Sequence, residues 1–221
     1  MNVYDSDFDW PEGTQIDALR IIQVLPKTTA PPNRPRIGVA EQTNARAVLG
    51  TVPVESDGSA YFEVPAGKEI YFQALDRRGM AVQSMRSGTI VRPGETAGCV
   101  GCHEDRRESV KYDRKAAAIR RAPQKLRSWY GKPRLYSYMA EVQPALDRHC
   151  VSCHDYGHEE GENLNLAGDL GLVFNLSYVE LRSKKYVKVP GAGPFQVLPP
   201  KSWGSHASRL AEVLVEGHGD P

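Results

Sequence analysis

The sequence lacks the long apolar segments and the strong charge that would mark a membrane protein or a nucleic-acid-binding protein. No apolar run approaches the roughly 18 residues that a transmembrane helix needs, so no membrane span is expected. The 28 Lys and Arg residues nearly balance the 27 Asp and Glu residues, which argues against nucleic acid as a partner. The N-terminus, residues 1–7, also lacks the basic and apolar regions of a secretory signal peptide.

Cysteine is scarce, and its placement is informative. Only four cysteines occur among 221 residues, and all of them lie in two Cys-x-x-Cys pairs. None is left over for a structural disulfide or a lone reactive thiol. A chain of this length buries a proper core without disulfides, so the pairs are free for another purpose. Each pair is followed at once by histidine, giving Cys99-Val100-Gly101-Cys102-His103 and Cys150-Val151-Ser152-Cys153-His154.

The Cys-x-x-Cys-His pattern is typical of covalent haem attachment. Two cysteines three positions apart reach both vinyl groups of one haem and form thioethers, and the next histidine is placed beneath the iron as its proximal ligand. The sequence therefore predicts two haem c groups. Their attachment residues are Cys99, Cys102 and His103 for the first and Cys150, Cys153 and His154 for the second. The competing interpretation is one zinc site made from the four cysteines, which leaves both histidines unexplained.

The ligand on the far side of each iron is left open among several histidines. The candidates are His149, which precedes its own motif and would reach the other haem, and His206 and His218, which flank a predicted helix. His158 lies in a polar loop, and for each of these residues a solvated surface position is the alternative. Three methionines are further candidates, although each also suits a place in a core: Met80, Met85 and Met139.

The first 95 residues predict a β-sandwich. Short runs rich in branched and aromatic residues alternate with turn signals such as Asp57-Gly58 and Asp76–Gly79. The expected strands cover residues 16–25, 47–54, 60–64, 70–74, 80–85 and 89–92.

Residues 96–221 predict a mostly helical, loop-rich di-haem domain, so the fold class is α+β. Helices are expected at residues 114–121, 139–149, 177–185 and 205–216. Residues 104–136 hold eleven Lys and Arg against four Asp and Glu, whereas residues 137–170 hold seven acids and one Arg. The basic stretch is expected to neutralise haem propionates or to bind an acidic redox partner. The alternative is that it forms a solvated surface without a partner.

Several blocks around the motifs resemble the middle and C-terminal region of hydrazine synthase alpha-subunit-like proteins. The resemblance covers most of the chain, including its β segment. The blocks that carry it are residues 87–104, 142–154, 174–178, 204–210 and 216–218.

This resemblance implies one catalytic haem and one electron-transfer haem with two histidine ligands. In the family, the histidine of the catalytic motif binds zinc, and a tyrosine four residues later takes the iron. Here that position is Arg107, and the nearest downstream tyrosine is Tyr112, so His103 is expected to ligate its own haem. The second motif carries over with His154 as proximal ligand and with His206 or His218 opposite it.

The preferred function is a di-haem cytochrome c that carries electrons between periplasmic or extracellular partner proteins. The alternative is a haem enzyme, an oxidoreductase of small nitrogen or oxygen compounds, with an open position at the first iron. A third possibility makes the β domain an adhesion or carbohydrate module. Because haem c is attached on the exported side of a bacterial membrane, the missing signal peptide suggests a fragment of a longer protein. Further haem domains of that chain, or of a complex, are expected as partners.

Overall fold

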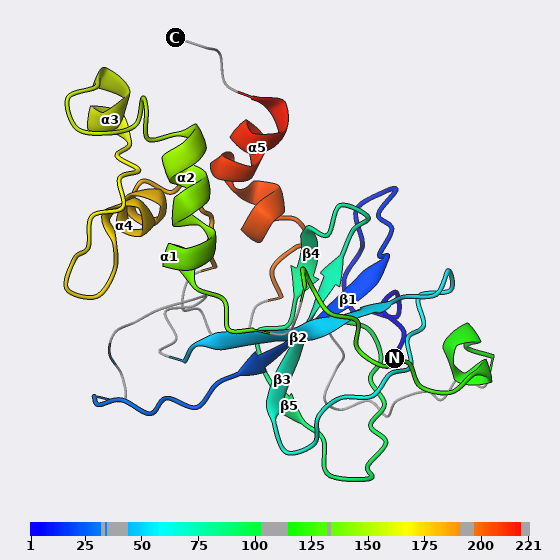
Figure 1. Cartoon of the computed structure of the whole chain (residues 1–221). Coiled ribbons are helices and arrows are strands. Elements are labelled where there is room, and N and C mark those ends of the chain that lie inside the picture. Colours follow the sequence, from blue (N-terminus) through cyan, green and yellow to red (C-terminus); the bar gives the residue numbers. More distant parts are fainter. Residues whose placement is uncertain (32–33, 35–43, 103–114, 132–133, 191–196, 218–221) are drawn as a thin grey trace.

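The computed structural model describes residues 1–31, 34, 44–102, 115–131, 134–190 and 197–217 (Figure 1). These residues form an antiparallel sheet and several short helices, which confirms the α+β class. His103, Arg107, Tyr112 and His218 lie outside the described residues. The predicted boundary between residues 95 and 96 stays a prediction.

The sheet has five antiparallel strands in the order β2-β1-β3-β4, and β5 pairs with β3. β4 pairs with the end of β3 and β5 with its beginning, so the two short strands share one edge. The strands occupy five of the six predicted segments: β1 (Ala18–Val24), β2 (Arg46–Pro53), β3 (Glu69–Leu75), β4 (Ala81–Ser84) and β5 (Thr89–Ile90).

One face of the sheet carries the larger core. Leu19 and Ile21 of β1 lie two positions apart, as do Ile70 and Phe72 of β3, and the period of two along a strand places them together on one side of the sheet. Segments outside the sheet complete the core, among them Val3 near the N-terminus. Burial of these apolar side chains is the main stabilising contribution in this half of the molecule.

The predicted sandwich is not confirmed, because the described residues form this one sheet without a second facing it. Residues 60–64, expected as a strand, contribute only an isolated bridge between Phe62 and Gln124. Phe62 still packs edge to face against Phe72, with ring centroids 5.7 Å apart. The alternation of apolar and polar residues in this segment therefore reflects packing of side chains against the core, and its backbone does not form a strand of the sheet.

The helices follow the predicted segments with breaks that have local causes. The predicted helix 139–149 divides at Val142, because Pro144 stands in the first turn of the second part, where its missing N–H costs nothing. The predicted helix 205–216 divides at Ser208, whose Oγ donates to Gly204 O at 2.7 Å. The α-helices are α1 (Tyr138–Glu141), α2 (Gln143–His149), α3 (Glu159–Asn163), α4 (Leu176–Ser183) and α5 (Arg209–Glu216).

Short 3-10 helices complete the described elements. η2 (Ala117–Arg120) forms within the segment 114–121 where a longer helix is predicted, and η3 (Gly204–Ala207) leads into α5. No helix is predicted from the sequence at the residues that form α3. No helix in the described ranges has both the length and the apolar character needed to cross a bilayer.

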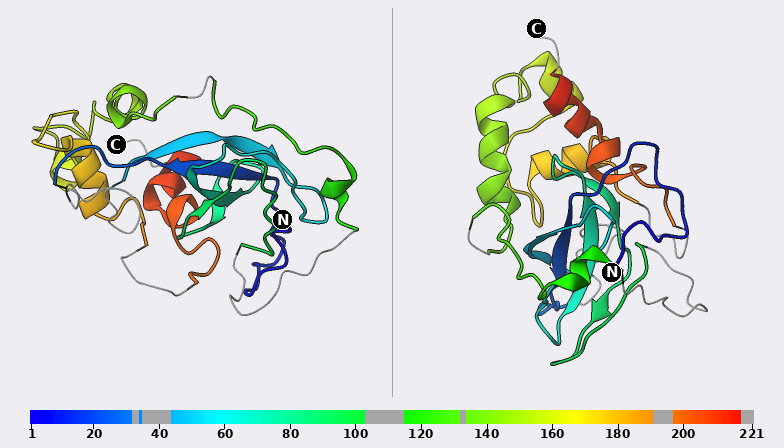
Figure 2. Two further views of the ribbon diagram at one scale, coloured as in Figure 1. Left: turned by 90° about the horizontal axis from the view of Figure 1, so that it is seen from below. Right: turned by 90° about the vertical axis from the view of Figure 1, so that its right-hand side faces the viewer.

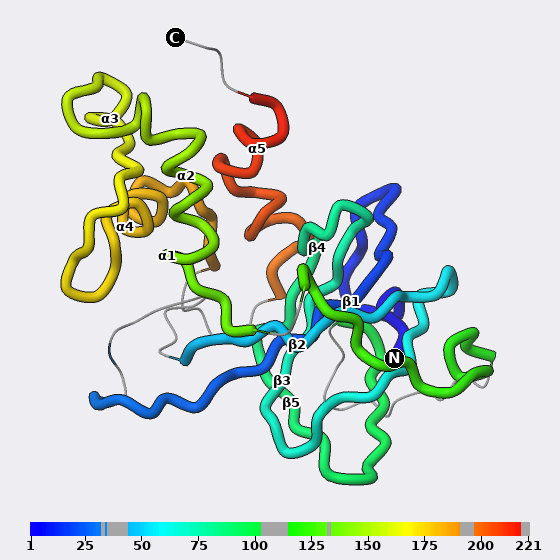
Figure 3. Tube along the Cα trace, viewed as in Figure 1, coloured from blue at the N-terminus to red at the C-terminus, as the bar shows by residue number. Residues whose placement is uncertain are grey.

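The sheet and the helices are joined by contacts from β4. Lys201 N donates to Val82 O at 2.8 Å, and Gln83 Nε2 donates to Leu198 O at 2.8 Å. Figure 2 shows η3 (orange) and α5 (red) beside the sheet, and the trace in Figure 3 follows the chain from the sheet into α1. The segment after residue 197 thus joins the C-terminal part of the described chain to β4 of the sheet.

Candidate haem-attachment sites

The second motif follows directly from α2, and its backbone continues in a tight turn. Cys150 N donates to Leu146 O at 2.8 Å, and both Cys153 N and His154 N donate to Cys150 O, at 3.1 and 2.9 Å. This turn places two thiols and an imidazole within one short stretch. It is the local arrangement that attachment of a single haem requires.

His154 has a defined ring orientation. Its Nδ1 lies 3.1 Å from Leu164 O, and Leu166 N donates to His154 O at 2.8 Å. A carbonyl oxygen only accepts, so the hydrogen of this bond is on Nδ1 and the lone pair is left on Nε2. Metal-binding histidines have this second contact in most proteins, because it fixes the tautomer and raises the basicity of the nitrogen that binds the metal.

A small leucine cluster supports the second motif. Its buried members are Leu146, Leu164, Leu166 and Leu181, and Cys150 packs against them. Burial raises the pKa of the Cys150 thiol.

Beside this cluster lies a buried polar network. Asn175 Nδ2 and Ser177 Oγ both donate to Gln143 Oε1, at 2.8 and 2.6 Å, and Gln143 Nε2 donates to Leu166 O at 3.0 Å. Because each of these buried groups is paired, the network ties α2 to α4 and to the segment that fixes His154.

The helical half leaves much apolar surface uncovered. All but one of the exposed large hydrophobic side chains in the described part of the chain lie between Tyr130 and Val215. Leu172 is fully exposed and Leu214 is 71% exposed, whereas the buried apolar cluster of this half consists of the four leucines. A large, flat, apolar cofactor would cover such surface, so the residues present fit a haem.

The first motif is held by the N-terminal segment. Gly101 N donates to Asn2 O at 2.7 Å, and Cys102 N donates to Ser6 Oγ at 2.9 Å. Gly101 has φ +65°, and a Cβ there would lie 2.2 Å from Asp5 O. Glycine is therefore required at this position of the motif both by its backbone angle and by the space available.

Cys102 packs against the sheet core, and its burial raises the pKa of the thiol to about 12. Cys99 is partly exposed. His103 lies outside the described residues, so its role as proximal ligand stays a prediction.

The zinc alternative requires all four cysteines in one place. Among the described residues, which include every cysteine, no group of three or more His, Cys, Asp or Glu side chains is close enough to hold a metal ion. Cys102 packs on the sheet core and Cys150 on the leucine cluster. The two pairs therefore belong to separate sites.

The candidate distal ligands are scattered. His149 is exposed at the end of α2, and His158 is exposed before α3. His206 Nε2 lies 3.2 Å from Asp76 Oδ2, where it makes no hydrogen bond, and burial lowers the pKa of the imidazole. His218 lies outside the described residues, so the choice of distal ligand stays a prediction.

The methionines do not change this choice. Met85 packs against the sheet core, and Met139 is 41% exposed on α1.

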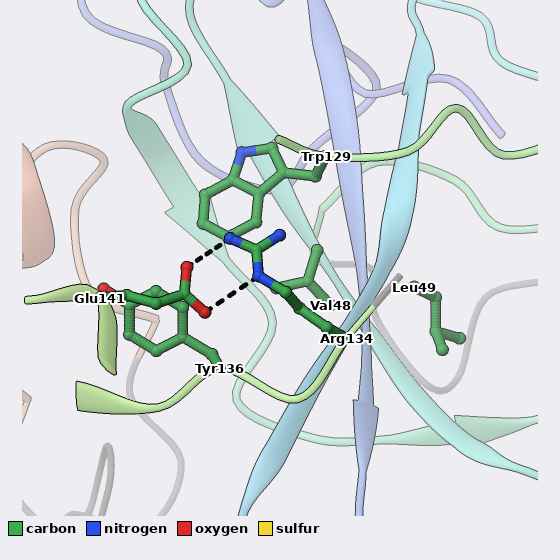
Figure 4. A pocket seen from close by; sticks show the side chains of 6 residues that line it. All are labelled: Val48, Leu49, Trp129, Arg134, Tyr136 and Glu141. Atoms are coloured by element: carbon green, nitrogen blue, oxygen red, sulfur yellow. Dashed lines mark hydrogen bonds and ion pairs between the residues drawn. The ribbon is translucent and has the colours of Figure 1, made fainter. Parts of the chain in front are cut away.

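The segment before α1 crosses the face of β2 (Figure 4). Arg134 Nε donates to Glu141 Oε1 at 3.0 Å, and Arg134 Nη2 pairs with Glu141 Oε2. Trp129 and Tyr136 flank this pair, with ring centroids 6.5 Å apart. The hollow between these side chains has a volume of about 10 Å³, which is too small for a ligand. The contacts of these side chains therefore anchor the segment between the two motifs on β2.

Comparison with known proteins agrees with these observations. Residues 13–104 match the family model of the hydrazine synthase alpha subunit middle domain. The match covers the sheet and ends just past the first motif. No curated protein sequence matches the chain.

Among solved structures, the hydrazine synthase of Kuenenia stuttgartiensis shares the fold. The TM-score is 0.55 at 22% sequence identity over 81% of this chain. The chain spans 32% of the length of that hydrazine synthase chain. A likeness at this identity establishes the fold and leaves activity open.

Sequence reasoning missed several residues at these sites. The carbonyl of Leu164 and the contacts of Asn2 and Ser6 carry no sequence signal, because any residue offers a carbonyl and polar residues near a terminus are common.

Proposed function

We propose that this chain is the haem-bearing part of a hydrazine-synthase-like oxidoreductase that acts on small nitrogen compounds. Cys99 and Cys102 would attach one haem c, and Cys150 and Cys153 would attach another. The observation that carries this proposal is the ring of His154, whose bond to Leu164 O leaves Nε2 as a ligand beside two cysteines. The family match over residues 13–104 and the shared fold support the oxidoreductase class.

The cysteines and the histidine of a motif would have different roles in binding a haem. The cysteines would fix the orientation of the cofactor by two bonds, and His154 would supply an axial nitrogen of fixed tautomer. A bound haem supplies an iron centre that accepts and donates single electrons. The exposed apolar side chains between Tyr130 and Val215 would exclude water from the second site.

We assign the reaction with substrate to the first motif. The sequence has Arg107 where the family resemblance implies a tyrosine ligand, so His103 would ligate the iron and leave its opposite side to a small ligand. The second motif has nearby histidines for a sixth ligand and would supply or remove electrons. As part of an alpha-subunit-like protein, the chain would work with other subunits, in the exported compartment where haem c is attached.

An electron carrier without substrate chemistry is the second candidate. The several histidines after the second motif favour it, because a sixth ligand at both irons closes them to substrate.

Carbon monoxide binding to the reduced, haem-loaded chain distinguishes the proposed enzyme from an electron carrier. The proposed enzyme binds carbon monoxide at one haem, with a shift of its Soret band, and this binding is lost when Cys99 and Cys102 are both replaced by Ala. A reduced protein whose spectrum does not respond to carbon monoxide contradicts the proposed enzyme and supports the carrier.

A further inference from the structure

A groove lies between the sheet and α5, on the face opposite the larger core. It has a volume of about 420 Å³ and includes none of the described motif residues among its lining. Ligand sites of proteins are commonly of this size and commonly lie where two parts of a molecule meet.

The walls of the groove are mostly apolar. Its apolar lining includes Val187 and Val189, Leu210 and Leu214 of α5, and Trp203 beside η3. Leu214 is 71% exposed in this position. The groove therefore presents the surface that the apolar body of a ligand would cover.

Arg20 supplies the charge. Its Nη1 donates to Gln73 Oε1 at 3.1 Å and its Nη2 to Gly79 O at 2.9 Å, while its guanidinium stands 4.6 Å from the centre of the Trp129 ring. Its Nε is buried without a hydrogen-bond partner.

Arg20 has no acidic partner in the described part of the chain. The groove is lined by Arg20 and Lys188 and by no Asp or Glu. A largely buried cation without a counter-ion is costly, and an anion in the groove would remove that cost.

We infer that this groove binds a carboxylate carried on an apolar body, with Arg20 paired to the carboxylate and α5 covering the apolar part. Two sources of this chemistry are open to test. One is a free amphipathic carboxylate. The other is the propionate edge of the second haem, because Val187 and Leu210 line the groove and also pack against the leucine cluster that holds Cys150. Only the second source depends on the proposed function.

The test uses the full haem-loaded chain, with decanoate as the probe in calorimetry and decylamine as the probe of opposite charge. Arg20→Gln and Leu214→Asp change the groove, and Arg77→Gln and Ile90→Asp are matched changes at exposed positions outside it. Midpoint potentials of the same variants are measured with Cys99 and Cys102 replaced by Ala, so that only the second haem contributes.

A free ligand predicts that decanoate binds, that decylamine does not, and that Arg20→Gln weakens binding at least tenfold, which is about 1.4 kcal/mol. A haem edge in the groove predicts no decanoate binding and a lower potential of the second haem in both groove variants. The inference is overturned if binding and potential are the same in groove and control variants. Leu214→Asp keeps the test valid if Arg20→Gln does not fold, since Leu214 is exposed on its helix.

Discussion

A single hydrogen bond orients the ring of His154, the proposed proximal ligand of the second haem. With Nδ1 held by Leu164 O, the imidazole offers Nε2 and no other nitrogen. We expect His154→Ala to keep its haem, because both thioether bonds remain, and to convert that haem from low to high spin. Electron paramagnetic resonance of the oxidised protein measures this change. A low-spin signal of unchanged intensity would show that His154 is not an iron ligand.

Gly101 is the residue of the first motif that the N-terminal segment constrains most. Gly101→Ala adds a Cβ that meets Asp5 O at a backbone angle which L residues avoid. We expect a loss of about 2–4 kcal/mol in the free energy of unfolding, measured by urea denaturation. Gly13→Ala is the control, because Gly13 has φ +70° with open space around it and should cost only about 1 kcal/mol. Equal losses would show that steric contact with the N-terminal segment is unimportant.

The motif residues themselves could be predicted from sequence, whereas their partners could not. Cys-x-x-Cys-His is a local pattern whose chemistry follows from spacing. The contacts of Ser6 with Cys102 span 96 positions, and those of Leu164 with His154 span ten. Contacts of this kind depend on how distant segments pack, which no local pattern records.

Among the elements, α2 is the one on which the second motif depends. Gln143 in α2 is buried. Its side chain accepts hydrogen bonds from Asn175 and Ser177 and donates one to Leu166 O. We expect Gln143→Leu to lower the free energy of unfolding by about 2–3 kcal/mol, because the partners stay buried and lose their bonds. Arg148→Ala, at an exposed position of the same helix, should change it by no more than about 0.5 kcal/mol. Similar values for both variants would contradict this account of the network.

The strands were predictable where alternation and pairing agree, as in β1 and β3. The segment 60–64 has the same alternation and yet forms no ladder, because Phe62 reaches the core from a segment that crosses outside the sheet. Alternation reports which side chains are buried, and it does not report whether the backbone has a neighbour to pair with. This is why the sequence predicted a sandwich where one sheet and its covering segments are found.

On the scale of the whole molecule, the chain combines a well-packed sheet with a sparsely packed helical half. The sheet core has ten buried apolar residues and the leucine cluster has four, although the helical half contributes nearly all the exposed apolar side chains. A large apolar cofactor, such as the proposed haem, would cover these exposed side chains. The whole-molecule prediction is that haem loading stabilises the helical half more than the sheet, which hydrogen exchange at α2 and α4 against β1 and β3 would measure. Equal protection of both halves would contradict it.

The central claim is that each Cys-x-x-Cys-His motif holds one haem c, and intact-mass spectrometry tests it most directly. The chain is produced with the cytochrome c maturation machinery and denatured, so that only covalently bound haem remains. The account predicts a mass increase of two haems, which falls to one when Cys99 and Cys102, or Cys150 and Cys153, are replaced by Ala. A chain that carries no covalent haem, or that loses both haems when one pair is replaced, would contradict it.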